Sequence, residues 1–156
     1  MKKDIFIDTN IASRFTNPMD TEYIKLINWL LKYEKNSDSN AYLVVSKKLL
    51  AEYNRSTMNA HTDTCIGVII NALLSQGRLT IITNDQIKEF LRVYFTKKVE
   101  KQLRSNNEDR QHIPVVLLSE RKYALAIDDN FVYDLTHFSG FYTRVEKRPE
   151  RLPYEN

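Results

Sequence analysis

Short apolar runs alternate with longer amphipathic segments along the chain. The runs at 5–7, 42–45, 79–82 and 123–127 contain mostly aliphatic and aromatic residues and are followed by polar ones, which is typical of buried strands. A fifth strand is predicted at 142–145. The segments 21–33, 47–55, 64–75, 86–103 and 113–121 have the apolar content and spacing of helices. This alternation predicts an α/β domain with a mainly parallel sheet of about five strands and helices on both faces.

The length and composition agree with one globular domain. The chain has 156 residues, of which 42% are hydrophobic, enough for a single hydrophobic core. We assign residues 1–148 to this domain and expect 149–156 to form a loose C-terminal tail. No apolar run approaches the roughly 20 residues that a membrane-spanning helix needs, and no signal peptide is recognisable. A cytoplasmic location without a membrane partner is therefore expected.

Charge and cysteine content exclude little beyond this. The formal net charge of +3 permits a polyanionic partner without requiring one. The lone Cys65 excludes a disulfide framework and a thiolate zinc cluster, and we expect it to be buried. Three histidines, at positions 61, 112 and 137, are far apart in sequence and form no ligand pattern, and His112 is expected on a helix surface.

Acidic residues recur where the predicted strands end. Asp8 follows the first strand, Glu52 lies about two turns into the helix after the second, and Asp109 opens the helix before the fourth. Asp128 and Asp129 end the fourth strand. Capping of a helix would explain any one of these aspartates by itself. Because the carboxyl ends of parallel strands meet at one edge of a sheet, however, we expect all four segments to converge there.

Converging carboxylates favour a particular chemistry. Crowded carboxylates raise one another's pKa, and a divalent cation removes that penalty. Oxygen ligands without histidine or cysteine favour hard ions such as Mg²⁺ or Mn²⁺. An ion of this kind activates water and neutralises charge on phosphate oxygens. The pattern therefore indicates hydrolysis of a phosphodiester in RNA or DNA.

Four motifs in this order resemble those of PIN-domain ribonucleases. Each is short, but together they extend over about residues 4 to 145. They are Ile5-Phe6-Ile7 followed by Asp8-Thr9-Asn10, then Val44-Val45-Ser46 followed by Leu49-Leu50-Ala51-Glu52, then Ser105-Asn106-Asn107-Glu108-Asp109 followed by His112-Ile113, and finally Leu125-Ala126-Ile127-Asp128-Asp129-Asn130-Phe131.

The resemblance implies a Rossmann-like three-layer α/β/α sandwich. It also implies a divalent-metal-dependent endoribonuclease that cuts single-stranded RNA, either a VapC-like toxin or a related bacterial PIN protein. Many bacterial members are toxins with an antitoxin partner, and many form homodimers. Both partners are therefore expected here as consequences of the resemblance.

The resemblance also implies roles for individual residues. Asp8 would be the central metal ligand, completed by Asp109 and by one of Asp128 and Asp129. Glu52 would hold metal-bound water or a second ion. A further set would orient the first aspartate or contact substrate and the RNA backbone, and it consists of Thr9, Asn10, Arg55 and Arg110.

Two positions leave the assignment of ligands open. In the fourth motif, Ala126 and Ile127 stand where the family usually has Thr or Ser, so either Asp128 or Asp129 could be the ligand. In the third, Glu108 could replace Asp109.

Basic and aromatic residues near the motifs have two readings as well. Arg104 could bind an RNA backbone or belong to a solvated face, and the aromatic residues at 131–142 could stack on bases or pack in the core.

Three other functions fit parts of the sequence. The missing hydroxyl of the fourth motif suits a PIN-like RNA-binding module that no longer cuts. A structural or partner-binding domain would show no salt-dependent affinity for RNA. A flavodoxin-like nucleotide binder shares the fold class, but no glycine-rich phosphate loop follows the first strand.

Overall fold

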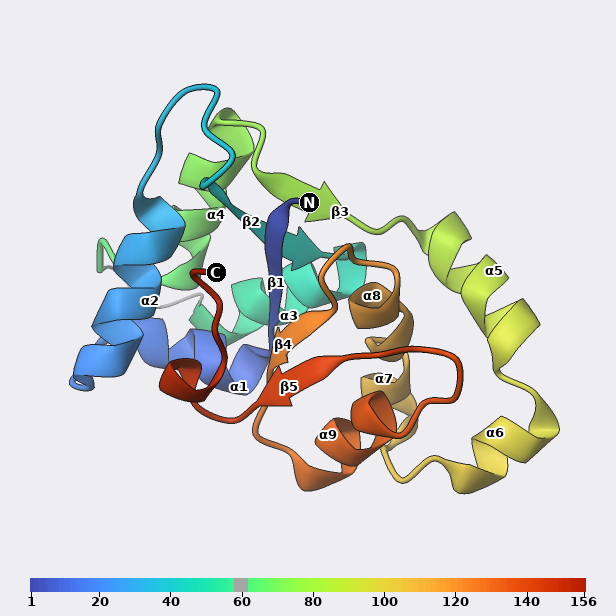
Figure 1. Ribbon diagram of the computed structural model, residues 1–156. Coiled ribbons are helices and arrows are strands. Elements are labelled where there is room, and N and C mark those ends of the chain that lie inside the picture. Colours follow the sequence, from blue (N-terminus) through green and yellow to red (C-terminus); the bar gives the residue numbers. More distant parts are fainter. Residues whose placement is uncertain (58–61) are drawn as a thin grey trace.

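Five parallel strands form the centre of the computed structural model, which describes residues 1–57 and 62–156 (Figure 1). The strands are β1 (Lys3–Ile7), β2 (Ala41–Val45), β3 (Leu79–Ile81), β4 (Tyr123–Leu125) and β5 (Arg144–Glu146). Their order across the sheet is β3-β2-β1-β4-β5, and every neighbouring pair is parallel. The predicted α/β class and parallel sheet are confirmed. His61 lies outside the described residues.

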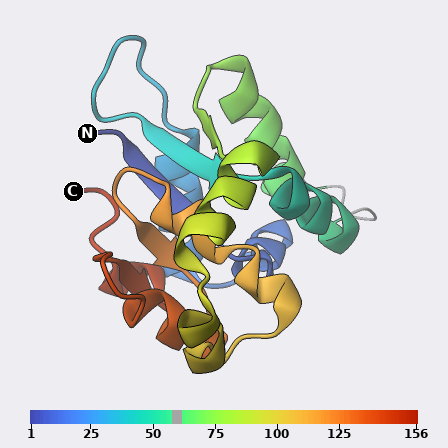
Figure 2. The same cartoon turned by 90° about the vertical axis from the view of Figure 1, so that its right-hand side faces the viewer.

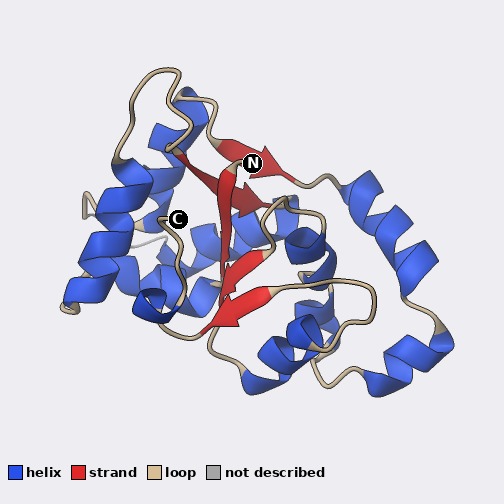
Figure 3. Ribbon diagram, in the orientation of Figure 1, coloured by secondary structure: helices blue, strands red, loops and turns tan. Residues whose placement is uncertain are grey.

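Helices cover both faces of this sheet (Figure 3). Their bounds are α1 (Thr9–Ala12), α2 (Thr21–Leu31), α3 (Lys47–Thr57), α4 (Ile66–Ser75), α5 (Asn84–Tyr94), α6 (Lys97–Gln102), α7 (Asn107–Arg110), α8 (Ile113–Leu117) and α9 (Asp129–Thr136), with 3₁₀ turns η1 (Ser13–Thr16) and η2 (Pro149–Arg151). Right-handed crossovers place α2 and α4 on one face and α8 and α9 on the other. Figure 2 shows α5 in front of the sheet on this second side.

The central strand β1 is almost entirely buried. Ile5, Phe6 and Ile7 are fully buried, because β1 lies between β2 and β4 and under helices on both faces. Asp4 in the same strand is also fully buried, and its carboxylate accepts the main-chain N–H groups of Glu120 and Arg121 at 2.8 and 3.0 Å. This contact ties the start of β1 to the turn before β4.

The predicted helix over 86–103 is two helices instead of one. The hydroxyl of Thr96 accepts the N–H of Val99 at 3.2 Å and so caps a separate helix α6. Apolar spacing continues through this break, and hydrophobic periodicity therefore does not detect it. In the described part of the chain, no helix has the length and hydropathy required to span a membrane.

The prediction that residues 149–156 form a loose tail is wrong, because this end of the chain packs on the domain. Leu152 and Tyr154 are 2% and 4% exposed, and the Tyr154 ring lies 4.9 Å from that of Trp29. Arg121 donates to the Tyr154 carbonyl at 2.9 Å. These contacts join residues far apart in sequence, and nothing local to the polar tail sequence signals them.

Removing the Tyr154 ring tests this packing. We expect Tyr154→Ala to lower the free energy of unfolding by about 2–4 kcal/mol, because a buried aromatic contact with Trp29 is lost. Tyr142 is 86% exposed, so Tyr142→Ala serves as the control and should change stability by less than about 0.5 kcal/mol. Urea denaturation measures both variants, and equal effects would contradict a packed tail.

Candidate metal centre

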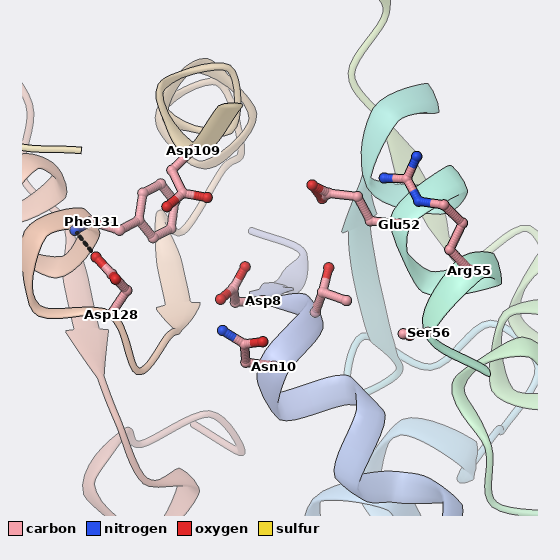
Figure 4. Close-up of a pocket in the computed structure, with 9 residues that line it drawn as sticks. Asp8, Asn10, Glu52, Arg55, Ser56, Asp109, Asp128 and Phe131 are labelled. Atoms are coloured by element: carbon pink, nitrogen blue, oxygen red, sulfur yellow. Dashed lines mark hydrogen bonds between the residues drawn. The ribbon is translucent and has the colours of Figure 1, made fainter. Parts of the chain in front are cut away.

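A cavity of about 410 Å³ opens at the carboxyl edge of the sheet. Four carboxylates line it, from Asp8, Glu52, Asp109 and Asp128. Figure 4 shows Asp8 and Asn10 between Asp109 and Asp128 on one side and Glu52 and Arg55 on the other. The remaining lining residues are Thr9, Asn10, Arg55, Ser56 and Phe131. The four acidic segments singled out in the sequence thus converge on one cavity.

Asp8 is held where β1 ends. Its main-chain N–H donates to the Leu125 carbonyl at 2.9 Å, which extends the pairing of β1 with β4 by one residue. Tyr53, buried in α3, donates its hydroxyl to the Ile7 carbonyl just before it. Asp8 is the N-cap residue of α1, yet its side chain makes no capping hydrogen bond. Its carboxylate is therefore available to the cavity.

Glu52 is held by His112, which is buried instead of lying on a helix surface. His112 is 1% exposed, and its Nε2 lies 2.6 Å from Oε2 of Glu52. The expectation that His112 lies on a helix surface is wrong, because its ring packs 5.9 Å from that of Phe6 beneath α3. The position of His112 three residues after Asp109, nearly one helical turn, was the only signal in the sequence.

The pKa of Glu52 follows from its surroundings. Partial burial by itself would raise it, but the hydrogen bond and the charge interaction with His112, together with Lys48 and Arg55, outweigh burial and lower the pKa. Glu52 is consequently ionised at neutral pH.

Asp109 and Asp128 form the opposite wall. Asp109 lies in α7, whose N-cap Asn106 accepts the Asp109 N–H at 2.8 Å. Burial raises the pKa of Asp109, and the nearby Asp128 raises it further. Asp128 caps α9 by accepting the Phe131 N–H at 3.0 Å (Figure 4). A carboxylate has two oxygens, so this cap leaves acceptor capacity at Asp128.

Two expected site residues lie elsewhere. The Asp129 side chain is 84% exposed and pairs with Lys147 instead of lining the cavity. Arg110 donates to the carbonyls of Ser105 and Leu103 at 2.9 and 3.2 Å, so its guanidinium holds the loop before α7. Both residues are one position beyond a lining carboxylate, and a step of one residue in a helix turns the side chain by about 100°. Glu108 does not line the cavity either.

Burial and like charges act together at Asp8. The pKa of Asp8 is raised to about 6: burial is the main cause and the charges of Asp109 and Glu52 act in the same direction, whereas the charge of His112 and the Thr9 N–H oppose them. Arg55 is the basic member of the described lining. Within residues 1–57 and 62–156, no three His, Cys, Asp or Glu side chains are close enough together, in their present conformations, to coordinate one metal ion. The cavity has an excess of negative charge that a cation would relieve.

The raised pKa of Asp8 predicts a pH-dependent penalty. Because the folded protein binds this proton more tightly than the unfolded chain, stability falls as pH rises from about 4 to about 6 and stays lower above that. In EDTA, Asp8→Asn should therefore stabilise the protein by roughly 1–3 kcal/mol near pH 7.5 and have little effect near pH 4. Urea denaturation at both pH values, with exposed Asp38→Asn as control, measures this. An equal effect at both pH values would contradict it.

Comparison with known proteins supports the fold. No protein-family model and no curated protein matches the chain. A chain of the crystal structure of VapBC2 from Rickettsia felis, bound to a DNA fragment from their promoter, is similar in structure with a TM-score of 0.55 and 17% sequence identity. The similarity covers 91% of this chain and 98% of that one. The protein therefore has an α/β fold with an all-parallel sheet flanked by helices, consistent with a PIN-like fold.

Proposed function

We propose that this protein is a divalent-metal-dependent endoribonuclease that hydrolyses phosphodiester bonds in single-stranded RNA. One observation carries the proposal: carboxylates from four separate elements line one cavity at the carboxyl edge of a parallel sheet. The order of the four sequence motifs, which resembles PIN domains, supports it. The structural similarity to a chain of the VapBC2 structure is in keeping with a VapC-like protein.

The lining fits Mg²⁺ or Mn²⁺ by the chemistry of its donors. Asp8, Asp109 and Asp128 would hold the ion, because hard divalent cations prefer carboxylate oxygens and water. Glu52 would hold a bound water or a second ion. These side chains come from separate elements and would turn inward to coordinate. When bound, such an ion lowers the pKa of water and neutralises charge on the phosphate.

The residues of the chain itself would orient substrate and water. Glu52 is ionised, and its Oε2 is engaged by His112, so Oε1 is left to accept a hydrogen bond from an attacking water. Arg55 and Asn10 offer donors to phosphate oxygens from two sides of the cavity. The buried Oγ1 of Thr9 has no hydrogen-bond partner among the described residues. Because this atom is buried, Thr9 would have to change its rotamer before its hydroxyl could contact substrate or water beside Asp8.

A partner chain belongs to the same proposal. PIN-domain toxins act with an antitoxin, and the similar solved structure is a VapBC2 complex on promoter DNA. We extend the proposal to a toxin role with an antitoxin partner, and to a homodimer, on the basis of that resemblance.

One alternative function has support of its own. No three carboxylates of the described residues are arranged to hold an ion as they stand, and Ala126 and Ile127 bring no hydroxyl to the fourth motif. Both features favour a PIN-like module that binds RNA without cutting it. The two functions differ in turnover and in metal dependence.

Cleavage of labelled single-stranded RNA by purified protein separates them. We expect cutting with Mn²⁺ or Mg²⁺ and none in EDTA, because the charge of the phosphate needs a cation. Asp8→Asn should reduce the rate by roughly 100-fold or more, since it removes the central carboxylate. Asp38→Asn, an exposed change of equal charge, controls for net charge. A folded wild type that binds RNA but cuts with neither metal would establish the alternative.

Comparison of Asp128→Asn with Asp129→Asn decides which aspartate of the pair acts. Asparagine caps a helix as well as aspartate does, so Asp128→Asn should preserve the fold of α9. We expect it to lower kcat/KM by about 100-fold, because it removes a cavity carboxylate. Asp129→Asn loses only an exposed ion pair with Lys147 and should lower kcat/KM by less than about 3-fold. The reverse order would assign the role to Asp129.

A further inference from the structure

A second cavity, of about 420 Å³, lies beside α9 on the side of α6. We propose that it binds one nucleotide of the RNA strand, a few nucleotides away from the bond that is cut, with a phosphate at Arg104 and the base against an apolar floor. This inference rests on the proposed function, because it names a further contact for the same substrate. The volume of this second cavity falls within the roughly 300–1,000 Å³ typical of ligand pockets.

Three side chains at the cavity form a continuous stack. The Arg104 guanidinium carbon lies 3.4 Å from the centre of the Tyr133 ring. The His137 ring is stacked on Tyr133 at 3.9 Å between centroids, with an angle of 18° between planes. Tyr133 is thus covered by two groups, whereas Arg104 and His137, at the ends of the stack, are exposed. A cation and an aromatic face are the two groups that bind single-stranded nucleic acid.

The stack is held in place by hydrogen bonds that involve the main chain. Asp134, 2% exposed, accepts the main-chain N–H of Arg104 at 2.9 Å and that of Ser105 at 2.8 Å. The Nδ1 atom of His137 lies 3.0 Å from the Tyr133 carbonyl, which fixes the imidazole ring on α9. Binding therefore requires little ordering of these groups.

The guanidinium of Arg104 is not committed to a carboxylate. Among residues 1–57 and 62–156 no ion pair involves Arg104, and the Asp134 carboxylate is occupied by main-chain donors and the Ser105 hydroxyl. An arginine stacked on an aromatic ring keeps its edge N–H groups free for a phosphate. The three lysines of α6, at 97, 98 and 101, are exposed nearby and add positive potential.

The floor of the cavity suits a base. Leu103, Val99 and Phe138 supply apolar surface, and Phe138 is 6% exposed. A planar base would cover this surface while its phosphate stays at the rim. This combination of apolar floor and cationic rim favours a nucleotide over a free anion, which would need no floor.

The position of the cavity connects it to the metal centre. Helix α9 has Asp128 at its N-cap in the first cavity, whereas Tyr133 and His137 lie at the second. The nine residue-to-residue steps from Asp128 to His137 correspond to roughly 13 Å along a helix. The segment from Arg104 to Asp109 likewise joins both cavities, and Figure 1 shows α6, α7 and α9 as neighbours at one end of the molecule. A strand of a few nucleotides would reach from one to the other.

Binding of fluorescent oligoribonucleotides to protein carrying Asp8→Asn tests the subsite, because that variant should not cut its ligand. Oligonucleotides of about 2 nucleotides, too short to reach both cavities, and of about 12 nucleotides are compared at fixed salt. We expect Arg104→Ala and His137→Ala each to raise Kd for the longer one by about 5- to 20-fold, and to affect the shorter one less. His137→Phe, which keeps a stacking ring, should bind within about 3-fold of its parent.

Lys98→Ala is the matched control, since Lys98 is an exposed cation of α6 that does not line the cavity. It should raise Kd by less than about 3-fold. The subsite would be overturned if Arg104→Ala and Lys98→Ala raised Kd equally, or if the rise in Kd did not depend on oligonucleotide length. Thermal melting verifies that each variant folds. If Arg104→Ala weakens binding of the longer oligonucleotide and the wild type never cuts RNA, the nuclease proposal would be refuted while the subsite would stand.

Discussion

The position of β1 between β2 and β4 is the constraint on which the rest of the structure depends. Parallel pairing on both sides brings the carboxyl ends of three strands together, and the Asp8 N–H continues the pairing to Leu125 for one residue beyond β1. The carboxylate of Asp8 is thereby placed between segments that follow its two neighbours.

This arrangement concentrates negative charge, and the surrounding contacts offset part of its cost. The pKa of Asp8 is raised to about 6, chiefly by burial, because its poorly solvated carboxylate costs free energy when it is ionised. The buried ring of His112 forms a hydrogen bond with Glu52, and one oxygen of Asp128 accepts the Phe131 N–H of α9. The site therefore combines a destabilised central group with firmly held neighbours, a pattern that structures maintain where binding or catalysis needs it.

Helix α9 joins the chemistry of the cavity to the proposed recognition of the strand. Its N-cap carboxylate lines the first cavity, while Tyr133 and His137 stack at its far end with Arg104. Buried Asp134, on the same helix, holds the main chain that leads to α7 and Asp109. A single helix thus sets the spacing between the two cavities, and in the proposed function the same spacing would separate the two contacts with the substrate strand.

The sequence alone determined the fold class, the strands and the four converging acidic segments, because apolar runs, their spacing and the residues at strand ends are local signals. The tertiary structure alone decided that Asp128 lines the cavity while Asp129 pairs with Lys147, and that Arg110 holds a loop. It also decided that His112 is buried against Glu52 and that the C-terminal residues pack on the domain. The pairing of Asp129, the burial of His112 and the packing of the C-terminal residues depend on contacts between residues far apart in the chain. The contacts of Arg110 are local, but a helix turn of about 100° per residue points its side chain away from that of Asp109, which the sequence does not show.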